Sequence, residues 1–278
     1  MNLIVQAKDI PTPSLKELAR LAGAQAIEAV SRTAFRLTDV DDAHREEVST
    51  FCEANALDCG WVPAERRIGD FGLLVMDMDS TLITIECIDE IADMQGLKPQ
   101  VSAITEAAMR GEIDFAESLR RRVSLLAGLD QSALQRVYDE RLQLSPGAEA
   151  LLTAARAAGI KILLVSGGFT FFTERLKPRL GLDYTAANTL DVADGKLTGR
   201  VLGDIVDAQG KADWLNRVRS ELNLTREQVI AMGDGANDLK MMAAAGVSIA
   251  YRAKPVVRAQ ASHALNQVGL DGVIPLLG

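Results

Sequence analysis

Three short apolar segments, each ending in small or acidic residues, constrain the fold of this chain more than any other feature. They lie at residues 73–77, 160–166 and 229–233. Helical patterns stand between or beside them, at residues 147–158, 211–222 and 238–245. Continuous apolar strands that alternate with helices predict a parallel sheet with helices on both faces. We therefore expect an α/β core with a doubly wound, Rossmann-like parallel sheet.

A long insertion separates the first two of these strands. Residues 86–144 carry a helical pattern throughout and no strand signal. Because a crossover between parallel strands needs far fewer residues, we predict a helical cap here that covers the site. Further along the chain, Asp194 and Gly195 stand between two short alternating segments, and they predict the tight turn of an antiparallel hairpin.

The segment before the first core strand has a different pattern. Residues 3–7 and 26–37 predict extended structure, and helices are predicted from residue 12 and from residue 41. Residues 63–70 are charged and include proline and glycine, a composition typical of a linker. The 278 residues leave room for one domain or two. We predict a small α+β domain of ferredoxin-like pattern at 1–69 and a second domain at 70–278, with the cap at about 86–144.

Charge and hydropathy exclude two classes of partner. The formal net charge is −8 and the pI is about 5.0, so no basic field attracts nucleic acid or an anionic membrane surface. The longest apolar stretches fall far short of the roughly 18 residues that cross a membrane. We therefore expect a small-molecule substrate, no nucleic acid, no membrane, and a monomer or homodimer.

The amino-terminal segment and the cysteines favour a reducing location. No basic stretch followed by a longer apolar core opens the sequence, so no secretory signal is predicted and the cytoplasm is expected. The cysteines, Cys52, Cys59 and Cys87, form neither a CxxC pair nor an even set, and we expect reduced structural thiols. His44 and His263 have no partner in their segments, and we expect each at the surface or hydrogen-bonded.

Polar residues follow each of the three core strands, at the edge where an open α/β sheet binds its ligands. They are Asp77 and Asp79, Ser166 with its glycines, and Asp234 and Asp238. Four carboxylates brought together repel one another and raise each other's pKa unless a cation neutralises them. Ligation by oxygen alone, without histidine or thiolate, favours Mg²⁺. The alternative is that an aspartate after a strand only caps a helix or fills a turn, which explains one such residue more readily than four.

A lysine and a serine add donors suited to a phosphoryl group. Lys211 stands at a predicted helix start, an unfavourable place for a cation unless an anion lies beside it. Ser166 offers a hydroxyl and, with Gly167 and Gly168, backbone amides at a strand-to-helix turn. Other motifs fail, because no Ser or Thr follows Lys211 as in a Walker loop and Leu164 breaks the GxSxG pattern around Ser166.

A carboxylate nucleophile, a magnesium ion and these donors predict phosphoryl transfer through an aspartyl-phosphate. Asp77 would attack phosphorus. Asp79 would protonate the leaving alcohol and later activate water, because the two half-reactions run in opposite directions.

Five motifs are similar to those of a known family. They are DMDST at 77–81, IDEIA at 88–92, RVSLL at 122–126, VSGGF at 165–169 and GDGAND at 233–238. Through them, residues 70–270 resemble the phosphoserine phosphatases of the haloacid dehalogenase superfamily. The resemblance implies an enzyme that hydrolyses O-phospho-L-serine to L-serine and phosphate with Mg²⁺, through an aspartyl-phosphate, as the last step of L-serine biosynthesis. The first 69 residues resemble, loosely, the ACT-like appendage of bacterial members.

The resemblance also implies roles for single residues. The residues that would hold Mg²⁺ are Asp77 and Asp234, through their side chains, and Asp79, through its carbonyl. The residues that would bind the phosphoryl group are Ser166, Gly167, Lys211 and Asn237, with Asp238 supporting the site.

In the cap, the resemblance implies substrate recognition by Glu86, Met109, Phe115 and Arg122. An acidic group and a guanidinium complement the ammonium and the carboxylate of phosphoserine. Taken without the family, Glu86 and Arg122 would be solvated helix charges, and Met109 and Phe115 would be core residues that also wall a pocket.

Two alternatives stay open at this point. A related phosphatase or phosphotransferase would act on another small phosphomonoester such as phosphohomoserine, and the cap would decide which acceptor enters. A non-catalytic amino-acid sensor would have lost part of the site, whereas Asp77, Asp79, Lys211 and Asp234 are all present. We expect the N-terminal unit to shield the core or to mediate dimerisation.

Overall fold

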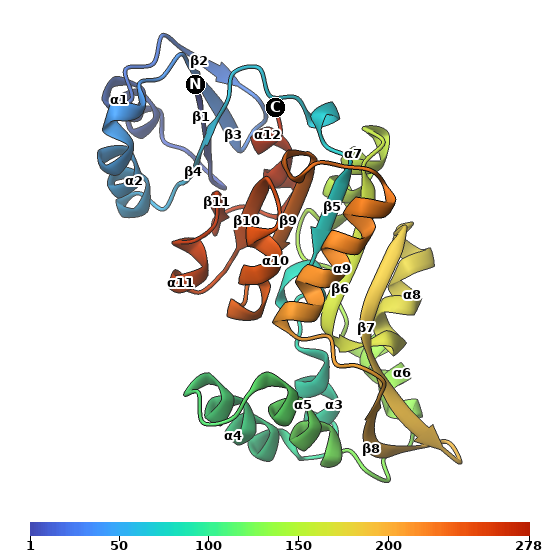
Figure 1. The fold of residues 1–278 in the computed structure, drawn as a ribbon. Helices are drawn as coiled ribbons and strands as arrows, with labels where there is room; N and C mark the ends of the chain where they lie inside the picture. Colours follow the sequence, from blue (N-terminus) through green and yellow to red (C-terminus); the bar gives the residue numbers. More distant parts are fainter.

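The computed structural model describes residues 1–278 and contains two separate sheets (Figure 1). The larger sheet has seven strands in the order β11-β10-β9-β5-β6-β7-β8. In chain order these strands are β5 (Leu73–Met76), β6 (Lys161–Phe169), β7 (Tyr184–Ala193), β8 (Lys196–Leu202), β9 (Val229–Gly233), β10 (Val247–Tyr251) and β11 (His263–Leu265). Neighbouring strands are parallel, except for the antiparallel pair β7 and β8. The predicted doubly wound fold is confirmed, and the predicted turn at Asp194 and Gly195 joins β7 to β8 with positive φ at both residues.

Helices cover both faces of the larger sheet. They are α7 (Ala148–Ala157), α8 (Thr170–Leu180), α9 (Ala208–Glu221), α10 (Leu239–Ala243), α11 (Pro255–Arg258) and α12 (Val273–Leu276). Side chains of β5 alternate between two cores: Leu74 and Met76 pack with α7 and α8, and Leu73 and Val75 pack with α9 and α10. All four are buried, which explains the continuous apolar sequence of this central strand. No helix of the chain is long and apolar enough to cross a lipid bilayer.

The order of the strands reverses at β5. The chain proceeds from β5 to β6 and β7 on one side, and then crosses to β9 and β10 on the other. In doubly wound sheets, ligands bind at such a switch point, beyond the carboxyl ends of the strands. Here the switch point lies between the ends of β5 and β9, which are Met76 and Gly233.

The insertion after β5 forms four helices beyond this end of the sheet (Figure 1). They are α3 (Cys87–Asp93), α4 (Lys98–Met109), α5 (Phe115–Ser124) and α6 (Ser132–Glu140). Two backbone hydrogen bonds of 2.8 Å, from the Gly128 amide to the Leu197 carbonyl and from the Leu197 amide to the Leu129 carbonyl, join this cap to β8. The cap therefore rests on the β7–β8 hairpin as well as on the segments that lead into and out of it.

The smaller sheet is antiparallel, with the order β2-β3-β1-β4. Its elements, with the two helices that cover it, are β1 (Asn2–Gln6), α1 (Thr12–Leu21), β2 (Ala26–Ala29), β3 (Ala34–Thr38), α2 (Arg45–Ala54) and β4 (Asp58–Val62). This arrangement agrees with the expected ferredoxin-like pattern. The single extended stretch expected at 26–37 is wrong, because a turn at residues 30–33 divides it into β2 and β3. The domain boundary at residue 69 stays a prediction.

The smaller sheet is attached to the C-terminal residues of the chain. The Asp58 carboxylate accepts hydrogen bonds from the amides of Asn266 and Gln267, both at 2.8 Å. The Gln6 side-chain amide donates to the Gly272 carbonyl at 2.9 Å. Buried apolar side chains of β1 and β4 also join the core of the larger sheet, so the two sheets share one packed boundary.

The two histidines lie in different environments. His44 is exposed, as expected. His263 is buried and its Nδ1 has no hydrogen-bond partner, so the expectation of a surface or hydrogen-bonded ring is wrong there. Burial, with the charges of Arg66 and Arg45, lowers the pKa of His263 to about 4. The ring therefore stays neutral, which removes most of the cost of burying it.

Candidate active site

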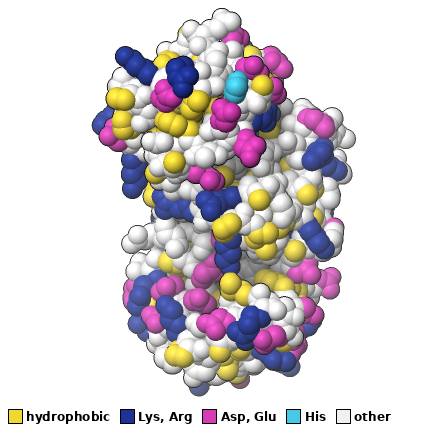
Figure 2. Space-filling view, turned by 90° about the vertical axis from the view of Figure 1, so that its left-hand side faces the viewer, with side chains coloured by type: hydrophobic (Ala, Val, Ile, Leu, Met, Phe, Trp, Pro, Cys, Tyr) yellow, Lys and Arg dark blue, Asp and Glu magenta, His cyan; other side chains and the backbone are white.

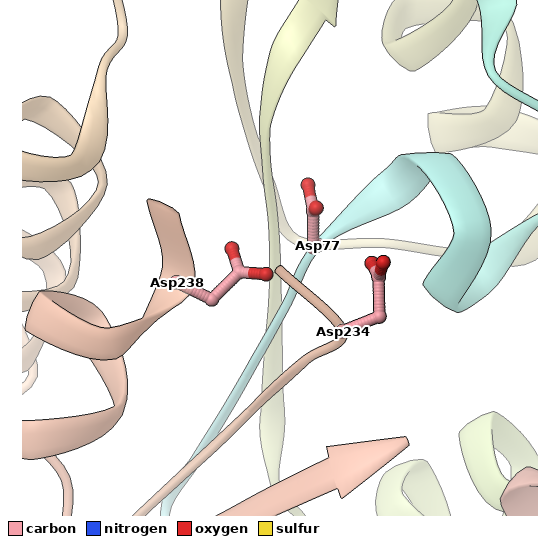
Figure 3. A group of neighbouring side chains, drawn as sticks. All are labelled: Asp77, Asp234 and Asp238. Carbon is pink, nitrogen blue, oxygen red and sulfur yellow. The ribbon is translucent and has the colours of Figure 1, made fainter. Parts of the chain in front are cut away.

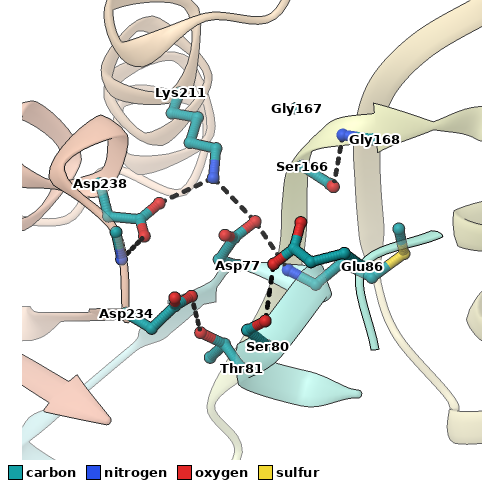
Figure 4. A network of polar contacts seen from close by, with 12 residues as sticks. Asp77, Ser80, Thr81, Glu86, Ser166, Gly167, Gly168, Lys211, Asp234 and Asp238 are labelled. Carbon is teal, nitrogen blue, oxygen red and sulfur yellow. Dashed lines mark hydrogen bonds and ion pairs between the residues drawn. The ribbon is translucent and has the colours of Figure 1, made fainter. Parts of the chain in front are cut away.

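A buried lysine joins two aspartates at the switch point (Figure 4). Asp77 directly follows β5, and Asp238 precedes α10. Lys211 of α9 places its Nζ 2.7 Å from Oδ1 of each carboxylate. Burial alone would lower the pKa of Lys211, but the charges of Asp238 and Asp77 together raise it above its usual value. The lysine is therefore charged, and it holds both carboxylates in place.

Asp234 adds a third carboxylate to this group. Oxygens of Asp77, Asp234 and Asp238 lie within 4.8 Å of one another, and the side chains of Asp77 and Asp234 point to the same side (Figure 3). Both Asp238 oxygens are engaged, Oδ1 by Lys211 and Oδ2 by the Gly235 amide at 3.0 Å. Oδ1 of Asp77 and Oδ1 of Asp234 also accept hydrogen bonds, whereas their Oδ2 atoms accept none. These two Oδ2 atoms are free to bind a cation.

Negative charge exceeds positive charge around this point. The ionisable residues that face one another are the acids Asp77, Asp79, Glu86, Asp234 and Asp238 and the bases Lys211 and Arg122. Burial and the charge of Asp238 raise the pKa of Asp77 well above its usual range, and the same two causes raise that of Asp234 to about 6. A divalent cation would offset this repulsion, and oxygen ligands fit Mg²⁺. The residues therefore fit the predicted metal, and the Asp79 carbonyl as a further ligand stays a prediction.

Asp79 lies on the tight turn Met78–Leu82, two residues after Asp77. Its Oδ1 is buried without a hydrogen-bond partner, and its Oδ2 lies 3.0 Å from where a Cβ on Gly168 would stand. Burial, and then the charge of Glu86, raise the pKa of Asp79 to about 8. A carboxyl group with this pKa holds a proton near neutral pH, as a general acid must.

Ser166 and its glycines lie within β6, so their expected place in a turn after the strand is wrong. The pairing of β6 with β7 shifts register between Val165 and Phe169, and the two glycines lie in this bulge. Ser166 is buried, and its Oγ accepts a hydrogen bond from the Gly168 amide at 2.8 Å. Its own O–H is therefore free to donate to a ligand oxygen. The Gly167 amide as a donor stays a prediction.

Two cap residues of opposite charge face these carboxylates. Glu86 precedes α3, and its Oε1 accepts a hydrogen bond from Ser80 Oγ at 2.6 Å. Arg122 lies half-buried on α5; burial lowers its pKa, and the charges of Asp89, Glu86 and Asp79 oppose that shift. Acidic and basic side chains also gather around the hollow between the cap, below, and the core (Figure 2). The structure thus brings the predicted pair together beside Asp79.

The two apolar cap residues lie in different places. Phe115 reaches from the start of α5 to the β6 bulge, where a Cβ on Gly167 would stand 2.8 Å from Phe115 Cζ. Met109 ends α4 and is 65% exposed, with its Sδ 3.8 Å from Lys254 Nζ. The core position expected for Met109 is therefore wrong, because the end of α4 faces solvent and the loop after β10. Its role in binding substrate stays a prediction.

Two asparagines hold the site to different extents. Asn237 lies on the turn before α10, with its Oδ1 folded over the backbone of Gly235. Asn188 of β7, which the sequence patterns did not single out, is buried; its Nδ2 donates to the Gly167 carbonyl and its Oδ1 accepts from the Val206 amide, both at 2.8 Å. It therefore joins the β6 bulge to the segment that leads into α9. The sequence signal that could have indicated Asn188 is a polar residue at a position that the alternating pattern of β7 places in the interior.

Two hydroxyls on the turn after Asp77 were also not singled out. Thr81 Oγ1 donates to Asp234 Oδ1 at 3.1 Å, which leaves the other oxygen of that carboxylate free. Ser80, which donates to Glu86, has a φ of 55°, a conformation that is uncommon outside glycine. These two residues connect the turn to the metal and cap sides of the site.

Comparison with known proteins assigns this geometry to a family. Residues 74–243 match the haloacid dehalogenase-like hydrolases. The chain belongs to this family. Residues 3–48 match a domain of unknown function.

Individual relatives of this haloacid dehalogenase-like hydrolase agree with the match. The chain is 55% identical over 216 residues to a phosphoserine phosphatase of a Polaromonas species, across 76% of this chain and 92% of that protein. The structure of a probable phosphoserine phosphatase from Vibrio cholerae superposes with a TM-score of 0.86 at 40% identity, across 99% of this chain and 86% of that chain. A phospho-aspartyl intermediate analogue of phosphoserine phosphatase superposes with a TM-score of 0.70 at 37% identity, across 75% of this chain and 99% of that chain. The resemblance inferred from the motifs is confirmed, and the chain is a hydrolase.

Proposed function

We propose that this hydrolase releases L-serine and phosphate from O-phospho-L-serine with Mg²⁺, as the last step of L-serine biosynthesis. The observation that carries this proposal is that Glu86 and Arg122, of opposite charge, lie beside Asp79, two residues after Asp77. Phosphoserine offers an ammonium to Glu86 and a carboxylate to Arg122 while its phosphate reaches Asp77. The activity named for the Polaromonas relative supports the same substrate.

In the first half-reaction the Asp77 carboxylate attacks phosphorus, and the bond from phosphorus to the serine oxygen breaks. Asp79 gives its proton to that oxygen, and L-serine leaves. Water then attacks the phosphorus of the aspartyl-phosphate, and the Asp79 carboxylate accepts a proton from it. The bond from phosphorus to Asp77 breaks, and phosphate leaves. The pKa of about 8 suits Asp79 to both directions of proton transfer near neutral pH.

Charge on the transferring phosphoryl group is balanced by fixed donors. Lys211 is held by Asp238, and Ser166 is oriented by the Gly168 amide, so neither has to reorganise during the reaction. We assign the Gly167 amide as a further donor and Asn237 to phosphate binding. Asp77, Asp234 and the Asp79 carbonyl would hold Mg²⁺, which when bound would supply positive charge to the phosphoryl oxygens.

Affinity for Mg²⁺ is expected to rise with pH. Burial and Asp238 raise the pKa of Asp234 to about 6, so below that pH the ion must displace a proton. The association constant should increase at least about tenfold between pH 5 and pH 7, as measured by titration calorimetry. Asp234→Asn should lose most of this binding, and Asp204→Asn, at an exposed position, should keep it. An affinity independent of pH would contradict the assignment.

Arg122→Ala is expected to impair phosphoserine selectively. Removing a charged hydrogen-bond partner typically costs about 1.5–3 kcal/mol, which corresponds to a fall in kcat/KM of roughly 10- to 150-fold. Phosphoethanolamine has the ammonium but lacks the carboxylate, so its turnover should change less than about threefold. Steady-state phosphate release on both substrates makes the comparison, with Arg120→Ala, exposed on the same helix, as the matched control. Equal losses on the two substrates would remove Arg122 from carboxylate recognition.

The location and assembly that we propose rest on the thiols and on the smaller sheet. Cys52 and Cys59 lie within hydrogen-bond reach of each other and are both free, which suits a reducing compartment such as the cytoplasm. The four residues of the edge strand β2 are all exposed, so a monomer or a homodimer paired through this edge is compatible with the fold.

A further inference from the structure

A crevice lined by three arginines lies where the smaller sheet meets the segment that follows it. Its volume is about 260 Å³, and its lining includes Asn2, Arg36, Arg66, Arg67 and Gly278. Because Asn2 and Gly278 both line it, the two ends of the chain lie beside the crevice, and Figure 1 marks both ends on the same side of the molecule. Junctions between packed units are common places for small-molecule sites. None of these residues belongs to the active site described above.

The geometry of the smaller sheet places the side chains of Arg36 and Asn2 at this crevice. Arg36 of β3 lies opposite Ile4 of β1, and Asn2 lies opposite Val62 of β4. Directly opposed residues share a face of a sheet, and so do residues two apart along a strand. Ile4 and Val62 pack into the core of the larger sheet. Arg36 and Asn2 therefore point to the same side, toward the segment that contains Arg66 and Arg67.

The guanidinium groups of Arg66 and Arg67 form no ion pair. Arg66 is half-buried, and its Nη1 donates a long hydrogen bond of 3.5 Å to the Leu276 carbonyl. Burial lowers the pKa of Arg66, and the more distant charges of Asp70 and Glu65 only oppose that shift. Arg67 Nη1 donates to two main-chain oxygens of its own loop, at 2.7 and 2.9 Å.

The positive charge of Arg36 is only weakly neutralised. Its partner is Glu28 of β2, with Oε2 3.9 Å from Nη1, and the Glu28 side chain is 56% exposed and free to swing away. A pair of this kind contributes little in water. Three positive charges from two separate segments thus converge on one concavity in a chain whose formal net charge is −8.

We propose that this crevice binds a small oxyanion that carries a phosphate or two carboxylates. Guanidinium groups bind both kinds of oxygen in bidentate geometry, and three of them surround the cavity. Its volume equals that of about nine water molecules in the liquid, at about 30 Å³ each, which limits the ligand to a few heavy atoms beyond the anionic group. Such a ligand joins β3 to the segment after β4, so it should stabilise the attachment of the smaller sheet.

Binding stoichiometry of the full chain tests the site. Inorganic phosphate is the first probe and malonate the second, each by equilibrium dialysis in buffer that contains saturating Mg²⁺. Phosphate is also the product of the proposed reaction, so the wild-type chain is expected to bind two phosphates, one in the active site and one in the crevice. In Arg36→Gln/Arg67→Gln the second site should weaken at least tenfold, while kcat/KM for phosphoserine stays within twofold of the wild type.

A matched control removes the same charge elsewhere. Arg226→Gln/Arg258→Gln changes two exposed arginines outside the crevice and should retain both phosphates. Should the crevice double variant fail to fold, Arg67→Gln alone, at an exposed position, carries the same expectation. Binding of either probe in the crevice supports the proposal. Whichever of phosphate and malonate binds there more tightly identifies the class of ligand. One phosphate per wild-type chain that the crevice variant still binds, or two in the crevice variant at unchanged affinity, would overturn it and leave the proposed function untouched.

Discussion

Asp77→Asn is expected to reduce phosphate release by at least about 10³-fold and to leave the fold intact. An asparagine keeps an oxygen that can accept from the Met78 amide, now at 2.8 Å, but it cannot form the aspartyl-phosphate. Burial and Asp238 already disfavour the charged form of Asp77, so a neutral side chain should not destabilise the metal-free protein. Single-turnover phosphate release and thermal unfolding measure the two effects.

Asp204→Asn is the matched control for this substitution, since residue 204 is exposed and distant from the switch point in sequence. It should retain wild-type turnover. If Asp77→Asn keeps more than a few per cent of the activity, another group is the nucleophile. A large loss of thermal stability in Asp77→Asn would show instead that the carboxylate is structural.

Lys211→Met is expected to lower the free energy of unfolding by about 3–5 kcal/mol and to abolish turnover. The substitution leaves two buried carboxylates, Asp77 and Asp238, without the cation that now lies 2.7 Å from each. Without that cation the pKa of Asp77, which burial already raises, should lie still further above that of the unfolded chain. The deficit should therefore be largest at neutral pH and shrink as Asp77 takes up a proton toward pH 5. Urea unfolding in chelated buffer at both pH values measures it.

A second substitution separates the two roles of this lysine. Lys211→Met/Asp238→Asn removes one of the stranded charges, so it should recover a large part of the lost stability but none of the activity. The account of the buried charge group fails if Lys211→Met unfolds within about 1 kcal/mol of the wild type.

The site could be located from sequence because its residues follow strands. In a parallel sheet the carboxyl ends meet at one edge, so Asp77 and Asp234 had to lie near each other once their segments were identified as strands. The reason given for Lys211 was less accurate. Helix α9 begins earlier, at Ala208, with the Asp207 side chain capping it, and the anions beside Lys211 are carboxylates of the protein itself.

Other features depend on contacts that no local pattern contains. A serine followed by two glycines is compatible with a turn and with a bulge, and only the pairing of β6 with β7 shows that Ser166 and its glycines form a bulge. Asn188 acts through that same bulge, so its role follows from tertiary pairing. The exposure of Met109 depends on how α4 lies against the core, which helical periodicity alone does not determine. Short strands such as β11, with three residues, are too brief for a periodic signal.

The most direct test of the central claim is phosphate release from L-phosphoserine, phosphothreonine, phosphohomoserine and p-nitrophenyl phosphate, each with Mg²⁺ and with chelator. The account predicts a strong preference for L-phosphoserine that disappears when the metal is removed. Comparable turnover of all four esters, or turnover of the aryl ester alone, would contradict the roles proposed for Glu86 and Arg122. Absence of phosphate release from all four would contradict the hydrolytic mechanism itself.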